Sequence, residues 1–244
     1  MPELIKYIDI NKSFKGYKVL DNLNLTVNKG DLIGLIGKSG EGKTTLLRVM
    51  IGFYKVDSGK ILFNGEDITK KSYKIKNVIG FCTQENSFYP ELTIEENMYY
   101  YGRLYNIKRN ILKPRITELL DLVDLSRNKK KHAGSISGGM KRRLDFAISL
   151  LPNPDILIFD EPTTGLDPII KKSVWDLIQK INKEGKTIIV SSHSLDFIQE
   201  KCPKICILSK GKVHLFTIEA LLKKYPKAKN LNNIFVKMIN EGAV

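Results

Sequence analysis

Apolar and polar residues alternate over the first eighty positions in short blocks that end at turn-forming residues. The blocks LIKYIDI, LDNLNLTV, LIGLIG, KILFNG and NVIGFCT are strand-sized and rich in β-branched or aromatic residues, which is typical of strands that pack on a core. One helix is expected among them. It starts in a glycine-rich loop and has apolar residues at helical spacing, at Leu46, Leu47, Val49 and Met50.

The pattern becomes helical between residues 93 and 151. The stretch TIEENMYYYGRLYNI opens with Thr93 and has Glu96 three residues later, which is the arrangement of a capping box. The stretch ILKPRITELLDLVDL follows with apolar residues at helical spacing. Its Pro114 is expected in the first helical turn, where a proline costs no hydrogen bond. A further helix is predicted after SISGG.

Strands and helices alternate again after residue 154. The blocks DILIFDE, KTIIVSS and KICILSK are predicted strands, with helices at about 169–183 and from about residue 194 between them. This alternation is typical of an α/β core, so residues of about 86–152 are predicted to be a mostly helical insertion in that core. The last thirty residues are predicted to form a lysine-rich helical tail.

The net charge is the one unusual bulk property of the chain. Its 244 residues hold 40 Lys and Arg against 26 Asp and Glu, a formal net charge of +14 at pH 7. Such a surplus fits nucleic acid, an anionic membrane surface or a solvated lysine-rich surface. The lysines are scattered and form no stripe interleaved with aromatic residues, which favours the solvated surface first and a membrane-adjacent face second.

The sequence also predicts a reducing, cytoplasmic environment. No apolar run approaches the roughly eighteen residues of a bilayer-spanning helix, and the N-terminal MPELIKYIDINK has charges where a signal peptide is apolar. The three cysteines, Cys82, Cys202 and Cys206, lack the spacing of a metal site. They are expected to be structural, and Pro203 argues against a helix between the last two.

A phosphate-binding loop is predicted between the strand LIGLI and the helix that follows it. Residues 37–44, GKSGEGKT, fit the pattern G-x-x-x-x-G-K-[ST]. Glycines let backbone N–H groups turn toward a phosphate, and the helix N-terminus adds its dipole. Lys43 is expected to contact the β- and γ-phosphates of ATP, and the hydroxyl of Thr44 is expected to bind Mg²⁺.

Two adjacent carboxylates follow the apolar strand ILIF. A buried strand brings Asp160 to its carboxyl end, where ligands bind in open α/β sheets, and Asp160 is expected to hold Mg²⁺ through water. Glu161 comes next and is expected closer to the γ-phosphate and the attacking water. The pair is therefore predicted to divide metal binding and general-base catalysis between them.

With these motifs the chain resembles the ATP-binding cassette family, the nucleotide-binding subunits of ABC transporters. The resemblance covers roughly residues 4–215, with five elements in the family order: GKSGEGKT, CTQENSFYPELT, SISGGMKRR, ILIFDEPTTGLDP and VSSH. It implies an α/β fold, a P-loop NTPase core with an antiparallel β subdomain and an inserted helical subdomain. Residues 1–217 are the implied ATP-binding domain, and residues 218–244 are the tail.

The resemblance implies a role for each motif residue. It makes Gln84 a further ligand of Mg²⁺ and makes His193 a catalytic partner of Glu161 at the γ-phosphate. It makes Phe14 an aromatic that stacks on adenine, with core packing as the competing role. The loop residues that it implies bind ATP are Gly37, Lys38, Ser39, Gly40, Glu41, Gly42, Lys43, Thr44 and Thr45.

A second glycine motif, SISGG, raises the question of which phosphate it serves, because one ATP does not need two such loops from one chain. In this family the signature of one subunit caps the γ-phosphate that the other subunit binds, head to tail. The resemblance therefore implies two ATP molecules buried between two chains, in a homodimer or with a related chain. The residues implied to bind ATP in trans are Ser137, Gly138, Gly139 and Asp167.

The implied function is ATP hydrolysis that drives a separate transmembrane permease from the cytoplasmic face of the membrane, as a peripheral subunit without a nucleic-acid partner. GGMKRRL with DEPTTGLDP is similar to the exporter-type subfamily that serves drugs, polysaccharides, lipids or sodium. Ile136 and Met140 depart from the usual residues of the family signature, and the pair Pro203-Lys204 departs from the usual pair of that subfamily.

Two soluble alternatives stay open: an ABC ATPase acting on nucleic acid or the ribosome, and the ATPase of iron–sulfur cluster assembly. Only about fifty residues separate Gln84 from Ser137, and the chain holds one cassette. Both observations argue against the first alternative.

Overall fold

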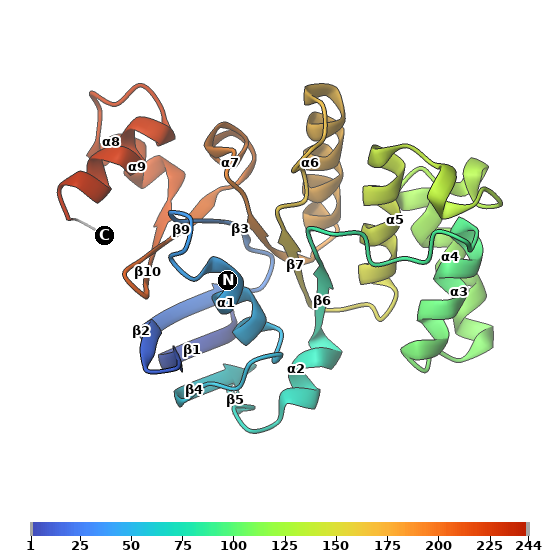
Figure 1. The fold of residues 1–244 in the computed structure, drawn as a ribbon, viewed down its shortest axis with the longest axis horizontal. Coiled ribbons are helices and arrows are strands. Elements are labelled where there is room, and N and C mark those ends of the chain that lie inside the picture. Colours follow the sequence, from blue (N-terminus) through green and yellow to red (C-terminus); the bar gives the residue numbers. More distant parts are fainter. Residues whose placement is uncertain (1, 243–244) are drawn as a thin grey trace.

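The computed structural model describes residues 2–242. The phosphate loop follows the carboxyl end of a central strand in a six-stranded sheet (Figure 1). The strands of this sheet are β3 (Leu32–Ile36), β6 (Ile79–Cys82), β7 (Ile156–Asp160), β8 (Thr187–Ser191), β9 (Lys204–Ser209) and β10 (Lys212–Thr217). Their order is β10-β9-β3-β8-β7-β6, parallel throughout except for β10. Every residue of β3 and β8 is buried, because helices or the second sheet cover both faces of a parallel sheet.

A second, antiparallel sheet lies beside the first. It has the order β2-β1-β4-β5 and consists of β1 (Glu3–Phe14), β2 (Tyr17–Asn28), β4 (Ser58–Phe63) and β5 (Glu66–Asp67). Helix α1 (Lys43–Met50) buries Leu46 and Leu47 in one core cluster with Leu23 of β2 and Ile33 of β3. The antiparallel β subdomain predicted from the family resemblance is confirmed.

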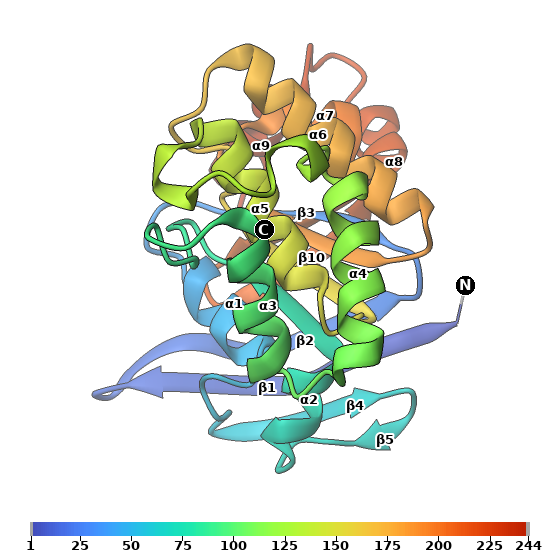
Figure 2. The same ribbon diagram turned by 90° about the vertical axis from the view of Figure 1, so that its right-hand side faces the viewer.

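The helical insertion forms one end of the molecule (Figures 1 and 2). It contains α3 (Ile94–Leu104), α4 (Arg109–Leu122), α5 (Gly138–Leu150) and two short 3-10 turns, Ser126–Asn128 and Ala133–Ser135. The predicted capping box of α3 is confirmed: the Thr93 hydroxyl accepts from the Glu96 amide at 3.2 Å, and the Glu96 carboxylate accepts from the Thr93 amide at 2.8 Å.

Two predictions about helices are wrong. A second helix, α2 (Ser72–Val78), lies within the first eighty residues; the residue at its N-cap position is Lys71, and lysine is not among the residues that usually cap a helix start. Pro114 lies inside α4, five residues after Arg109, and not in the first turn. The helix begins at Arg109, and its Leu112 packs so closely on Gly102 of α3 that a Cβ atom there would collide with it.

The remaining helices flank the C-terminal part of the sheet. They are α6 (Pro168–Lys183), α7 (Leu195–Lys201), α8 (Ile218–Lys224) and α9 (Leu231–Asn240). The tail helices bury Ile218, Leu231 and Met238 in the same core cluster as Ile198 of α7. β10 ends at Thr217 and α8 begins at the next residue. The division into residues 1–217 and 218–244 stays a prediction, because the tail shares this core.

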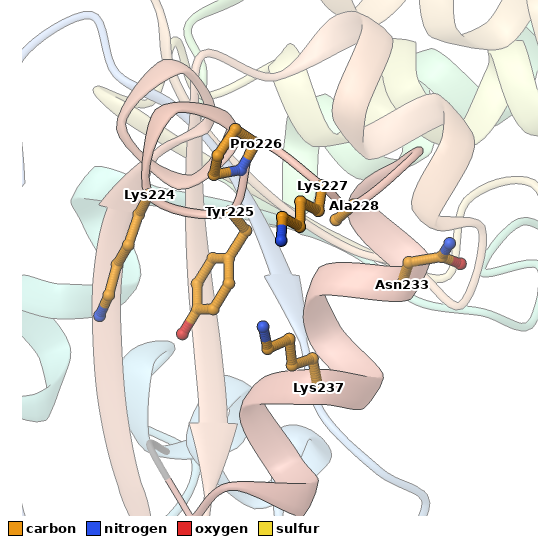
Figure 3. Close-up of a pocket in the computed structure, with 7 residues that line it drawn as sticks. All are labelled: Lys224, Tyr225, Pro226, Lys227, Ala228, Asn233 and Lys237. Atoms are coloured by element: carbon orange, nitrogen blue, oxygen red, sulfur yellow. The ribbon is translucent and has the colours of Figure 1, made fainter.

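A basic cavity, here called the lysine cavity, lies in the tail (Figure 3). It has a volume of about 520 Å³ and is lined by Lys224, Tyr225, Pro226, Lys227, Ala228, Asn233 and Lys237. The Nζ atoms of Lys224 and Lys237 lie 5.5 and 5.4 Å from the centre of the Tyr225 ring, within cation–π range. Positive charge is thus gathered at the end of the molecule opposite the helical insertion (Figure 1).

None of the helices in residues 2–242 combines the length and apolarity needed to cross a lipid bilayer. The three cysteines are buried free thiols. Burial raises the pKa of Cys82 and of Cys206 to about 12, so both thiols stay protonated near neutral pH. This fits the predicted structural role. Cys202 is the C-cap of α7 and Cys206 lies in β9, so no helix joins them.

Candidate active site

The phosphate loop joins β3 to α1, and its glycines are required by its shape. Gly40 and Gly42 have φ angles of +83° and +98°, a conformation that favours glycine. A Cβ atom on Gly42, the N-cap of α1, would lie 2.6 Å from Cγ1 of Val19. One on Gly37 would lie 2.6 Å from the carbonyl oxygen of Leu208. The loop therefore packs its backbone directly against β2 and β9.

Lys43 is held inside the loop that precedes it. Its Nζ donates to the carbonyl oxygens of Gly37 at 2.7 Å and Lys38 at 3.1 Å. Burial lowers the pKa of Lys43, and the negative charges of Glu161 and Asp160 oppose this shift. A cation in a partly desolvated loop with inward-facing amides is a site for a phosphate group.

One cavity of about 320 Å³ brings most of the predicted site residues together. It is lined by Ser39, Gly40, Gly42, Lys43, Thr44, Thr45, Gln84, Asp160, Glu161 and His193. These residues come from the phosphate loop, the loop after β6 and the carboxyl ends of β7 and β8. In an open α/β sheet this edge is where ligands bind.

Asp160 is the last residue of β7, and its side chain is fixed by the neighbouring strand. Its Oδ1 accepts a hydrogen bond of 2.6 Å from the hydroxyl of Ser191, the last residue of β8. The register pairs Asp160 directly with Ser191. Thr44 and Gln84 line the same cavity as Asp160.

Glu161 has the left-handed φ of +49°, and its amide donates to the Ser191 carbonyl at 3.2 Å and hydroxyl at 2.9 Å. Its Oε2 accepts from the Thr164 hydroxyl at 3.2 Å and from the His193 amide at 3.4 Å. Its Oε1 is buried and has no hydrogen-bond partner within residues 2–242. His193 Nε2 lies 3.3 Å from that oxygen but outside hydrogen-bonding geometry. A carboxylate oxygen in the cavity is thus left available as a proton acceptor.

A second cavity of about 530 Å³ adjoins the first and shares Ser39 and Gly40 with it. Its wall consists of Tyr17, Lys18, Val19, Lys38, Ser39, Gly40, Glu41, Lys210 and Gly211. Phe14 is not part of this wall; its ring packs edge-on against Tyr54 at 5.1 Å. Tyr17, 75% exposed, is therefore a second candidate aromatic for adenine, which the sequence reasoning missed. Stacking by Phe14 stays a prediction.

The signature segment, Ser137–Gly139, forms the start of α5 and does not line the phosphate cavity. Ser137 is exposed and is the N-cap, its hydroxyl accepting from the Met140 amide at 3.4 Å. A Cβ atom on Gly139 would lie 2.8 Å from Cγ2 of Ile170 in α6, whereas one on Gly138 would meet only Leu166 at 3.4 Å. Gly139 is thus required by packing within the chain, and the exposed helix start is available for an anion.

Asp167 also lies outside the phosphate cavity. It is the N-cap of α6, and its Oδ1 accepts from the amides of Ile169 and Ile170, both at 3.0 Å. The side chain therefore has a capping function in its own chain. Its predicted contact with the ATP of a second chain stays a prediction.

Two buried charged residues of α5 were missed by the sequence reasoning. Arg142 donates to the carbonyl oxygens of Thr83 and Gln84, and Asp145 accepts from Ser87. The available signal was their position, because Arg142 and Asp145 lie three residues apart on the apolar side of a helix, where charges are rare without partners.

The family model described as ABC transporter matches residues 20–164 of the chain. The matched segment begins before the phosphate loop and ends after Glu161, so it includes the whole phosphate cavity except His193. The chain belongs to the ABC transporter family.

Curated relatives of this ABC transporter protein are ATP-binding subunits. The chain is 32% identical to the ABC transporter ATP-binding protein NatA of Bacillus subtilis over 245 residues, which covers 98% of this chain and 99% of NatA. It is 35% identical to the Nod factor export ATP-binding protein I of Rhizobium sp. (strain N33) over 203 residues, or 83% of this chain and 67% of that protein. The chain is thus an ATP-binding and hydrolysing subunit of an ABC transporter.

Solved structures support the same fold. An ATP-binding cassette of an ABC transporter in its ADP conformation superposes with a TM-score of 0.81 at 26% identity, covering 97% of this chain and 99% of that one. The cbiO1 protein of Clostridium perfringens, part of the complex cbiONQ, superposes with a TM-score of 0.84 at 24% identity, covering 97% and 100%. The predicted fold class is confirmed.

Proposed function

We propose that this ABC ATPase binds MgATP in the phosphate cavity and closes head to tail on a second ATP-binding subunit, with hydrolysis reopening the pair. One observation carries the proposal. The phosphate loop, the acidic pair and His193 share one cavity, whereas the signature segment and Asp167 lie outside it on exposed helix starts. A second chain supplies what each cavity lacks.

The donors in the cavity fit Mg²⁺. Thr44, Gln84 and Asp160 line the cavity together and carry hard oxygen donors, a hydroxyl, an amide oxygen and a carboxylate. Mg²⁺ is typically bound by one or two protein groups together with phosphates and water. Within residues 2–242 no three His, Cys, Asp or Glu side chains gather into a protein-only metal site, which matches this mode of binding. Bound Mg²⁺ would neutralise charge on the β- and γ-phosphates.

Glu161 is the proposed general base and His193 its partner at the γ-phosphate. The buried Oε1 of Glu161, which accepts no hydrogen bond within residues 2–242, would accept a proton from the attacking water once His193 turns aside. His193 is 63% exposed at its side chain and lies beside that oxygen, so it is free to turn toward a γ-phosphate. Lys43 and the loop amides hold the phosphates in line for the attack.

The proposed partner is a separate transmembrane permease, which the chain meets as a peripheral protein at the cytoplasmic face of the membrane. Exposed aromatic and aliphatic side chains gather on and beside α3: Tyr89, Tyr100, Leu104 and Tyr105. Tyr89 lies on the loop that follows Gln84 and packs edge-on against Tyr100 at 4.8 Å. A patch of this kind marks a protein interface, and its continuity with the Gln84 loop supports docking of the permease there.

The names of the relatives support export as the direction of transport, because they include a Nod factor export protein and the linearmycin resistance protein LnrL. They favour a transporter subunit over the two soluble alternatives, and we expect no nucleic-acid partner.

The experiment is complementation between two inactive variants, Lys43→Ala and Ser137→Arg. In a mixed dimer one composite site loses both residues while the other keeps both. We expect each variant alone to lose hydrolysis, Ser137→Arg to keep ATP binding as a monomer, and the mixture to regain part of the activity. Full ATPase activity of Ser137→Arg alone would contradict the proposal.

A further inference from the structure

The loop that carries Gln84, residues 83–87 and here called the Gln84 loop, is fastened to α5 by two charged side chains. The guanidinium of Arg142 donates to the carbonyl oxygens of Thr83 at 2.6 Å and Gln84 at 2.9 Å. The carboxylate of Asp145 accepts from both the amide and the hydroxyl of Ser87, at 3.0 and 2.8 Å. Four hydrogen bonds thus connect one face of one helix to both ends of a five-residue loop.

The two side chains are buried. Arg142 is 5% exposed and Asp145 is 2% exposed, and the distance between Arg142 Nη1 and Asp145 Oδ2 is 3.9 Å. Buried charges are costly unless their hydrogen bonds are made. The planar guanidinium fork matches two backbone carbonyls, which a lysine ammonium does not do equally. Oδ2 of Asp145 already lacks a hydrogen-bond partner within residues 2–242, so it is the bonds made by Arg142 and by Oδ1 of Asp145 that resist a shift of the Gln84 loop relative to α5.

Helix α5 also carries the signature segment at its N-terminus, one turn before Arg142. The start of the helix is held in turn against α6, because Gly139 packs on Ile170 without room for a side chain. A shift of the Gln84 loop that keeps its bonds to Arg142 and Asp145 would accordingly shift α5 and the Ser137 hydroxyl at its start.

The same loop is contacted from its other side. The hydroxyl of Tyr101 in α3 donates to the carbonyl oxygen of Ser87, so Ser87 is held between the helix beside the proposed permease patch and Asp145. Glu85 and Asn86 complete the loop without a bond to α5 among the contacts described for residues 2–242.

We infer that Arg142 and Asp145 are positioning residues that make the Gln84 loop and the signature segment move as one body. Occupation of the chain's own ATP site, sensed at Gln84, then sets the position of the Ser137–Gly139 segment that serves the opposite site. The inference rests on the proposed function for the roles of these two motifs. It adds the residues that link them, neither of which contacts nucleotide.

The test measures amide hydrogen exchange with and without MgATP, at concentrations where light scattering shows a monomer. In the parent, we expect MgATP to slow exchange in residues 83–88 and also in residues 138–142. In Arg142→Met the phosphate-loop response stays, and the response at 138–142 falls by at least half. The control is Ser149→Ala, a buried residue of the same helix whose hydroxyl bonds only to the Phe146 carbonyl, which should respond as the parent does.

A second measurement uses the hydrolysis-blocked background Glu161→Gln. Adding Arg142→Met should raise the ATP concentration needed for half-dimerisation at least tenfold, with monomer ATP affinity unchanged within about threefold, because Arg142 lies outside the phosphate cavity. Circular dichroism checks the fold, and Ser87→Ala, which removes one donor to Asp145, is the milder variant if Arg142→Met unfolds. It should give a smaller loss in the same direction.

A full exchange response at residues 138–142 in folded Arg142→Met, or in Ser87→Ala if that variant must replace it, overturns the inference. So does a parent monomer whose signature segment does not respond to MgATP. A parent that responds in this way but never dimerises counts against the proposed head-to-tail sandwich and leaves the link between the two motifs supported.

Discussion

The substitution Glu161→Gln isolates the proposed chemical step, because it changes the proton-accepting atom and little else. In the structure Oε2 holds the contacts that fix the side chain, to the Thr164 hydroxyl at 3.2 Å and the His193 amide at 3.4 Å. A glutamine keeps a carbonyl oxygen for both. Its amide nitrogen takes the place of Oε1, the buried oxygen without a hydrogen-bond partner in residues 2–242. The fold therefore loses no hydrogen bond, only the contact of Oε1 with His193 Nε2, and the site loses its base.

The expected loss in turnover follows from this geometry. General-base catalysis contributes about a hundred- to ten-thousand-fold, which corresponds to about 2.7–5.4 kcal/mol at 1.36 kcal/mol for each factor of ten. ATP binding should change by less than about threefold, since Lys43, Thr44 and Asp160 are untouched. The effect should appear in kcat, because the lost interaction forms only in the transition state.

The assay is steady-state phosphate release over a range of ATP concentrations, with nucleotide affinity measured by calorimetry. Glu184→Gln, an exposed residue at the C-terminus of α6, is the matched control and should hydrolyse ATP at the parent rate. If Glu161→Gln also keeps the parent rate, the assignment of the base to Glu161 is wrong. If it loses ATP affinity in parallel with kcat, the argument that Oε1 acts only in the chemical step is wrong.

Three further predictions follow from the same structure. Burial lowers the pKa of Lys43, so its charge opposes folding at neutral pH and offsets its two hydrogen bonds to the Gly37 and Lys38 carbonyls. Lys43→Met should therefore change the apo melting temperature little, while the shift caused by MgATP disappears; a large apo loss would refute this balance. Gly139→Ala forces a Cβ atom against Ile170 and should lower the free energy of unfolding, measured in urea, by about 1–3 kcal/mol. Gly138→Ala should not lower it, and an equal loss in the two variants would refute the packing argument. The lysine cavity should help the protein bind anionic vesicles at low salt, and the protein should dissociate near physiological salt. The double variant Lys224→Glu with Lys227→Glu should float with these vesicles less than the parent protein does. Equal binding of the parent protein to neutral and anionic vesicles would show that these charges are not the cause.

Much of the fold was predictable because its signals are local. The phosphate loop, the buried strand before Asp160 and the capping box at Thr93 each need only a few adjacent residues. The failures were tertiary. Pro114 is inside α4, whose Leu112 packs on Gly102 of another helix, and the residue at the N-cap position of α2 is a lysine.

The residues of the candidate site fall into the same two groups, those with local sequence signals and those that depend on tertiary contacts. Residues of contiguous motifs, such as Lys43, Asp160 and Glu161, were found from the sequence and lie in one cavity. Tyr17 and the link from Arg142 to the Gln84 loop were not found, because both depend on where distant segments meet. Tyr17 lines the second cavity together with Gly211, and Arg142 lies 58 positions from Gln84. A sequence shows that a charged residue lies on the apolar side of a predicted helix, but it does not show which residue is its partner.

The central claim is that ATP joins two of these chains through the signature segment of each. The most direct measurement is size-exclusion chromatography with light scattering on Glu161→Gln, in which hydrolysis cannot release the closed state. We expect a monomer without nucleotide, a dimer with MgATP and a monomer with ADP. The double variant Glu161→Gln with Ser137→Arg should bind ATP and stay monomeric, because the arginine occupies the partner's phosphate pocket. A Glu161→Gln protein that binds ATP without hydrolysing it and never dimerises, or a double variant that dimerises as readily as the single one, would contradict the account.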